Sequence, residues 1–167
     1  MLKEQFANLR GQIPLMYGLM FINAWFLGIV TYRDVPVALS LGVPAILTMM
    51  IGVRCVVWIL RRQREPTPQQ IRRYFYGTIG IAAALSAAFG GWGLLLLSHE
   101  DPVRTTSVAL YIFLGSIGCC YCLQSLPIAG RLVLLFGAMP VTMRLLLSHD
   151  WFLVGIGLTF VLVACVI

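Results

Sequence analysis

Six apolar stretches, each about as long as a bilayer is thick, follow one another along this chain with short polar connections between them. A helix needs roughly 20 mostly apolar residues to cross about 30 Å of hydrocarbon. The runs are continuously apolar and lack the alternation of a transmembrane strand, and helices satisfy their own backbone hydrogen bonds in lipid. The sequence therefore predicts an all-α, polytopic membrane bundle of six transmembrane helices. The predicted spans are residues 13–32, 36–60, 76–98, 104–126, 129–148 and 151–167.

The composition excludes a water-soluble domain. Of the 167 residues, 60% are hydrophobic and 11% are charged, whereas a soluble domain carries about 25% charged residues. The net charge is +6, from 12 Lys and Arg against 6 Asp and Glu. In a soluble protein this excess would favour nucleic acid as a partner, but in a membrane protein basic residues collect in cytoplasmic loops. We therefore expect the lipid bilayer as the partner, and no nucleic acid.

The charged residues are divided unevenly between the two ends of the predicted spans, and this predicts the orientation. Four of the six acidic residues lie in the short turns 31–36, 98–102 and 148–151. Eight basic residues lie at the opposite end: Lys3, Arg10, Arg61, Arg62, Arg64, Arg72, Arg73 and Arg131. By the positive-inside rule, both the N- and the C-terminus are predicted to be cytoplasmic. The three turns also resemble one another, which is compatible with three tandem helical hairpins.

Two histidines, His99 and His149, each follow Leu-Ser at the outer end of a predicted span. Two imidazoles at equal depth could ligate a metal or a haem iron. The alternative is that each histidine caps a helix end and meets headgroups or water. No third ligand accompanies the pair, so haem stays an alternative and the cofactor is otherwise unknown.

Four polar residues inside or beside the spans are candidates for ligand contact or packing. Arg144, about one and a half turns before His149, and Asp150 are candidate ligand contacts. Arg144 could pair with Asp150, Glu100 or an anionic ligand headgroup, or extend to the outer interface. Asn23 is central in the first span, where an amide seeks an interhelical hydrogen bond. We expect it to be a packing residue first and a ligand contact second. Arg54 is expected to reach the cytoplasmic headgroups with its long side chain.

The third span carries two series of small residues at four-residue spacing. They are Gly80, Ala84 and Ala88, and Ala83, Ala87 and Gly91. Because such series let helix backbones approach closely, the third span is predicted to be central in the bundle or to line a dimer seam. Pro44 and Pro140 fall inside the second and fifth spans and are expected to kink them.

The remaining chemistry-bearing residues favour structural roles. The five cysteines all lie in apolar runs and are expected to act as small hydrophobes. Eight aromatic residues lie mostly toward the ends of the spans and are expected to form the aromatic belts at the membrane interfaces: Trp25, Trp58, Trp92, Trp151, Tyr17, Tyr32, Tyr74 and Tyr76. The chain has no phosphate-binding glycine loop, no HExxH motif and no soluble stretch long enough for a catalytic domain. We therefore expect no catalytic residues within it.

Four local segments share their layout and composition with a known family. They are residues 5–15 (QFANLRGQIPL), 17–23 (YGLMFIN), 43–47 (VPAIL) and 54–58 (RCVVW). The pattern resembles the N-terminal six-helix membrane sensor region of bacterial GGDEF and GGDEF–EAL signalling proteins. The resemblance runs over essentially the whole chain, but no sharp motif carries site residues over. It implies a multi-pass module of the bacterial inner membrane that works as a homodimer with a cytoplasmic domain acting on cyclic di-GMP.

On this basis residues 1–167 are expected to be a single transmembrane sensor domain, with a diguanylate cyclase or cyclic di-GMP phosphodiesterase domain following residue 167. The outer turns are too short to form a periplasmic domain, so the expected signal is a lipophilic small molecule or the membrane state itself. Two alternatives stay open. One is a small transporter with Asn23 and the prolines at its substrate site, and the other is a haem-binding sensor that uses His99 and His149.

Overall fold

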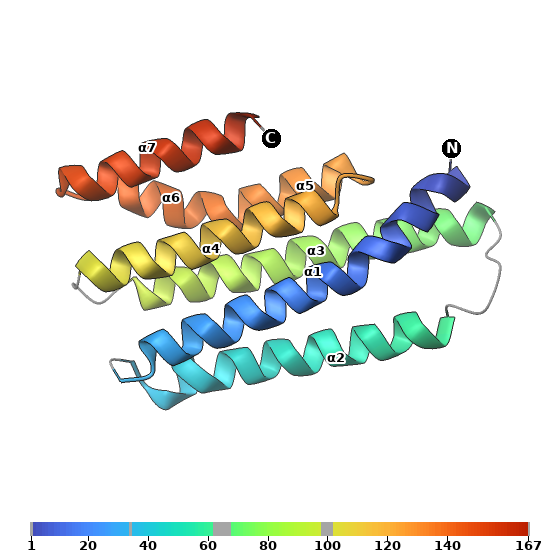
Figure 1. The fold of residues 1–167 in the computed structure, drawn as a ribbon, viewed down its shortest axis with the longest axis horizontal. Coiled ribbons are helices and arrows are strands. Elements are labelled where there is room, and N and C mark those ends of the chain that lie inside the picture. Colours follow the sequence, from blue (N-terminus) through green and yellow to red (C-terminus); the bar gives the residue numbers. More distant parts are fainter. Residues whose placement is uncertain (1, 34, 62–67, 98–101, 167) are drawn as a thin grey trace.

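The computed structural model describes residues 2–33, 35–61, 68–97 and 102–166 (Figure 1). These residues form helices joined by turns, and no strand occurs among them. The α-helices are α1 (Leu2–Thr31), α2 (Val43–Arg61), α3 (Pro68–Leu96), α4 (Pro102–Cys122), α5 (Pro127–Val133), α6 (Met139–Leu146) and α7 (Trp151–Val166). Two π-helical segments complete the fold: η1 (Ala38–Gly42) precedes α2, and η2 (Leu134–Ala138) joins α5 to α6.

Five helical segments are long and apolar enough to cross a membrane, which confirms the prediction of an all-helical membrane bundle. They are Gly11–Thr31, Ala38–Val57, Gln69–Leu96, Val103–Cys122 and Pro127–Leu146. Each coincides with one of the first five predicted spans. The sixth predicted span forms α7, an apolar helix of 16 residues, which is shorter than the roughly 20 residues that a full crossing needs.

Two helices begin well before the apolar stretches that predicted them. Helix α1 begins at Leu2, whereas the predicted span begins at residue 13, and α3 begins at Pro68 rather than at residue 76. Proline is favoured in the first turn of a helix because its missing N–H has no partner there. Pro14 lies inside α1 without ending it. Hydropathy thus identified the apolar part of each helix, and the helices continue past it through polar residues.

The helices run roughly along one common direction and alternate in sense (Figure 1). The N-terminal end of α1 and the C-terminal end of α7 point the same way, and the α4–α5 connection lies at this end as well. The α1–η1 and α6–α7 connections lie at the opposite end. This alternation agrees with the predicted division of the chain into a basic end and an opposite end.

Helix α3 is the central helix of the bundle, and α2 is the most peripheral of the five long segments. Helix α3 contacts α1, α4, α5, η2 and α6, and it buries Leu85, Phe89 and Trp92 among them. Helix α2 packs mainly on α1 and on the adjoining η1. Only 22% of the α2 span is buried, against 44% to 50% in the other four. Helix α2 is therefore held mostly by a single neighbour.

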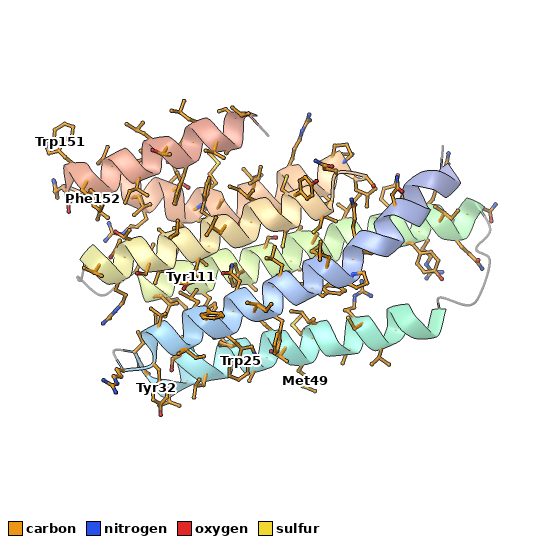
Figure 2. All side chains as sticks on the ribbon, in the orientation of Figure 1. Trp25, Tyr32, Met49, Tyr111, Trp151 and Phe152 are labelled. Atoms are coloured by element: carbon orange, nitrogen blue, oxygen red, sulfur yellow. The ribbon has the colours of Figure 1, made fainter. Side chains whose placement is uncertain are left out.

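The outer surface of the bundle is apolar, as expected for a protein in lipid. Large exposed hydrophobic side chains occur on every long helix, and Figure 2 shows Met49 on α2 and Trp151 on α7. Further examples are Leu15, Ile29, Ile46, Leu110, Leu114, Leu135 and Leu158. Soluble monomers rarely expose contiguous apolar patches larger than a few hundred Å², and exposed apolar side chains on every long helix are typical of a bundle that spans a membrane.

Both predicted proline sites follow π-helical turns. Segment η1 ends at Gly42, two residues before Pro44, and η2 ends at Ala138, two residues before Pro140. A proline ring clashes with the carbonyl four residues earlier and has no N–H to donate to it. A wider turn just before the proline relieves this clash, and π-helical turns are one recognised cause of bends in helices.

The carbonyl oxygens exposed by these two turns pack against glycines of neighbouring helices. The oxygen of Ser40, four residues before Pro44, lies where a Cβ of Gly28 on α1 would be. The oxygen of Phe136, four residues before Pro140, lies where a Cβ of Gly90 on α3 would be. Each π-helical turn is thus fitted to a glycine on the adjacent helix.

In η1, the carbonyl oxygen of Leu39 accepts a hydrogen bond from a tryptophan on α3. In π-helical register, the oxygen of Leu39 would accept from the residue five positions later, which is Pro44 and has no N–H. The indole Nε1–H of Trp92 donates to this oxygen at 2.9 Å. Trp92 is 3% exposed, so it is a buried packing residue, and its predicted place in an interfacial belt is wrong.

Candidate functional site

A cavity of about 180 Å³ lies between α1, α2 and α3, at the end of the bundle that carries the basic residues. Its walls come from the beginning of the first span, the end of the second and the beginning of the third. It therefore lies near the level of one membrane interface. The lining residues are Ile13, Tyr17, Arg54, Val57, Arg73, Tyr74, Gly77 and Thr78.

Arg54 lies half-buried in this wall, inside the apolar part of α2. Its guanidinium is within hydrogen-bonding reach of the hydroxyl of Tyr17 on α1, which is itself 7% exposed. The structure places Arg54 at this cavity between the helices. The expectation that its side chain reaches the headgroups stays a prediction. Tyr17 faces the bundle interior rather than a belt.

The cavity has basic charge without a described acidic partner. Arg73 on α3 lines the same cavity and is exposed. Asp150 is the one acidic residue whose side chain the structure describes, and it lies at the α6–α7 turn. Sequence analysis singled out Arg54 but missed its convergence with Arg73 and Tyr17, because the three residues lie on three helices whose pairing no local pattern reveals.

Asn23 joins α1 to α4. Its side-chain Nδ2 donates to the backbone oxygen of Tyr111 at 2.6 Å, and the residue is 8% exposed. Gly115 makes this approach possible, because a Cβ there would overlap the amide nitrogen of Asn23. One turn away, Phe26 and Tyr111 stack with ring centroids 6.4 Å apart. The geometry fits the interhelical hydrogen bond that was expected of this amide.

Arg144, His149 and Asp150 are all exposed at the end of α6 and in the following turn. The carboxylate Oδ1 of Asp150 accepts the backbone N–H of Phe152 at 2.9 Å and so caps the start of α7. No ion pair joins Arg144 to any residue in the described ranges. His99 lies outside the described residues, so the predicted histidine pair is not placed, and no cluster of three or more His, Cys, Asp or Glu occurs among the residues that were placed.

The small residues of α3 lie mainly on its outward face. Gly80, Ala84, Ala87, Ala88 and Gly91 are exposed, and Ala83 is half-buried. A Cβ at Gly80 or at Gly91 would meet no atom within 4 Å. Helix α3 is therefore the central helix on one face and presents a row of small residues to its surroundings on the other.

The described residues therefore offer two features with a possible function, which are the basic cavity and the small-residue face of α3. They share one helix, because Arg73 and Gly77 line the cavity and Gly80 and Ala84 continue the same face along α3. Comparisons of the chain with protein-family models, with curated proteins and with solved structures found no match. The function is accordingly inferred from these two features and from the residues that form them.

Proposed function

We propose that this chain is the membrane-embedded input module of a bacterial signalling protein. It pairs with a second copy through α3 and relays a lipophilic or membrane-borne signal to a cytoplasmic domain that makes or degrades cyclic di-GMP. In this proposal α7 is the sixth span, the membrane is the inner membrane, and both termini are cytoplasmic. The resemblance of segments in α1 and α2 to sensor regions of GGDEF proteins supports the output that is named here.

The small-residue face of α3 carries the proposal of a dimer. Lipid tails are as apolar as leucine, so helices in a membrane associate by close packing rather than by the hydrophobic effect. A row formed by Gly80, Ala84 and Ala88 lets a second backbone approach α3 closely. A second copy of α3 would supply a surface of the same shape, as a two-fold dimer requires.

Helix α3 belongs both to the cavity and to the proposed dimer face, so it can couple a signal at the cavity to the dimer. A ligand shifts a conformational equilibrium only by its differential affinity for the two states. The cavity is bounded by α3 on one side and by α2, the least buried span, on the other. A change at the cavity that moves α3 relative to α2 therefore changes the face on which two copies would meet.

Cysteine crosslinking in native membranes tests the dimer. With Cys55 and Cys165 replaced by alanine, the other three native cysteines are buried at 9% exposure or less. We expect Ala84→Cys and Ala88→Cys to give a disulfide-linked dimer under mild oxidation. Met49→Cys on α2, which is 73% exposed at the native residue, should stay monomeric. Equal crosslinking at Met49 and Ala84 would mean random collision and would remove the dimer from the proposal.

A chimaera tests the signalling role. Residues 1–167 are joined to a diguanylate cyclase domain that is active only as a dimer, and cyclic di-GMP is measured in cells. We expect Ala84→Leu, which fills the outward face of α3, to reduce cyclic di-GMP to the level of the cyclase domain alone. The matched change Ala45→Leu, at an exposed position of α2, should leave it unchanged at equal protein levels. Unchanged output with Ala84→Leu would contradict the role of this face.

A further inference from the structure

The cavity between α1, α2 and α3 is lined by two arginines. Arg54 enters from the end of the second span and Arg73 from the beginning of the third. A positive charge within an apolar span is costly and pairs with an opposite charge or faces a water-filled space. Arg54 lies in the apolar part of α2, and among the side chains that the structure describes no carboxylate lines this cavity, so an anion that enters the cavity would find basic partners there.

The chemistry of the lining identifies the class of anion. The planar guanidinium presents a fork of N–H donors that matches phosphate oxygens in a bidentate way. Tyr17 and Thr78, which carry hydroxyls, line the cavity together with the two arginines, while Ile13 and Val57 give it apolar walls. A volume of about 180 Å³ is several times the roughly 30 Å³ share of one water molecule, which is room for a small tetrahedral oxyanion.

The hydroxyl of Tyr17 lies within hydrogen-bonding reach of the Arg54 guanidinium, which restricts where this arginine side chain lies. A long arginine side chain loses about 2 kcal/mol of rotamer entropy when it is ordered, and a partner that holds it in advance reduces this loss on binding. Tyr17 is buried and belongs to α1, whereas Arg54 belongs to α2, so their contact also ties the peripheral helix to the bundle at the cavity.

We propose that this cavity is a binding site for a phosphate group, with Arg54 and Arg73 as its charged contacts and Tyr17 as a positioning residue. The cavity lies near one end of the spans, which is the depth at which phospholipid phosphates lie. The phosphate group could therefore come from an anionic headgroup or from a soluble phosphate ion. The site does not depend on the signalling role or on the dimer.

Lipid binding to the purified chain in neutral detergent tests the site. Native mass spectrometry follows phosphatidylglycerol binding, with phosphatidylcholine as the comparison lipid. We expect Arg54→Gln and Arg73→Gln each to weaken phosphatidylglycerol binding about tenfold or more, since a hydrogen bond to a charged group contributes about 1.5–3 kcal/mol. Tyr17→Phe should weaken it less, because it removes only the group that holds Arg54.

The neighbouring arginine supplies the matched control. Arg72 is also exposed on α3 but does not line the cavity, so Arg72→Gln should change the affinity less than twofold. Because Arg73 is exposed, Arg73→Gln should leave the core intact. It therefore tests the site even if Arg54→Gln fails to fold. Inorganic phosphate that displaces the lipid at millimolar concentration would assign the site to soluble phosphate, and persistent lipid binding would assign it to a headgroup. An equal loss with Arg72→Gln, or no loss with Arg73→Gln, would overturn the proposal.

Discussion

Replacing Gly90 with alanine is expected to destabilise the bundle more than any other single methyl addition on α3. The new Cβ would overlap the carbonyl oxygen of Phe136 in the π-helical turn η2. Backbone cannot rotate away as a side chain does, so α3 and η2 must separate. Overpacking of a core typically costs about 1–3 kcal/mol, and we expect about 3 kcal/mol here, measured as the free energy of unfolding in mixed detergent micelles.

The next residue provides the control for this prediction. A Cβ at Gly91 would meet no atom within 4 Å, and Gly91→Ala gains helix propensity of up to about 1 kcal/mol. Gly91→Ala should therefore leave the stability of an isolated chain unchanged or raise it. If the two alanine variants unfold alike, the close approach of η2 to α3 is not a feature of the folded protein.

Trp92→Phe is expected to lower the free energy of unfolding by about 2 kcal/mol, and Pro44→Ala should reduce this loss. The phenyl ring cannot donate to the part-buried oxygen of Leu39, and leaving a buried acceptor without a partner costs about 1–3 kcal/mol. Alanine at position 44 restores a backbone N–H that can donate into the turn. A double-mutant cycle separates this coupling from the volume that is lost with the indole, and we expect a coupling of about 1 kcal/mol.

Trp25 provides a comparison, because the acceptor of its hydrogen bond has a second partner. The indole Nε1–H of Trp25 donates to Thr48 Oγ1 at 2.9 Å, and that hydroxyl also donates to the oxygen of Pro44 at 2.7 Å. Thr48 keeps a partner when Trp25 is changed, so Trp25→Phe should lower the free energy of unfolding by about 1 kcal/mol or less.

For the double-mutant cycle of Trp92 and Pro44, a coupling energy of zero would show that the oxygen of Leu39 does not need the indole donor.

The spans were predictable because their signal is the sum of many residues. A run of about 20 apolar residues is typical of a membrane-spanning helix. The first five predicted spans each correspond to a helical segment in the structure. The polar N-terminal parts of α1 and α3 were missed, because hydropathy identifies residues that can lie in the hydrocarbon and does not locate the first residue of a helix. Pro68 was a usable signal for the second of these starts.

The pairing of helices was not predictable for a physical reason. In a soluble bundle the buried face of a helix is apolar and the outer face polar, whereas in lipid both faces are apolar. Exposed Met49 and buried Leu47, two residues apart on α2, are therefore equivalent in hydropathy. The contacts of Gly28 with Ser40, of Gly90 with Phe136 and of Tyr17 with Arg54 depend on which helix faces which.

The weak attachment of α2 has a consequence for how the chain responds to its solvent. A span that touches lipid over most of its surface takes its tilt from the match between its apolar length and the hydrocarbon thickness, at fractions of a kcal/mol per Å of mismatch. The four better-buried spans are restrained by their neighbours, so thinning or thickening of the membrane reorients α2 before it reorients them. Val57 and Arg54 belong to α2, so we expect a change in its tilt to alter the width of the space between these residues and α3.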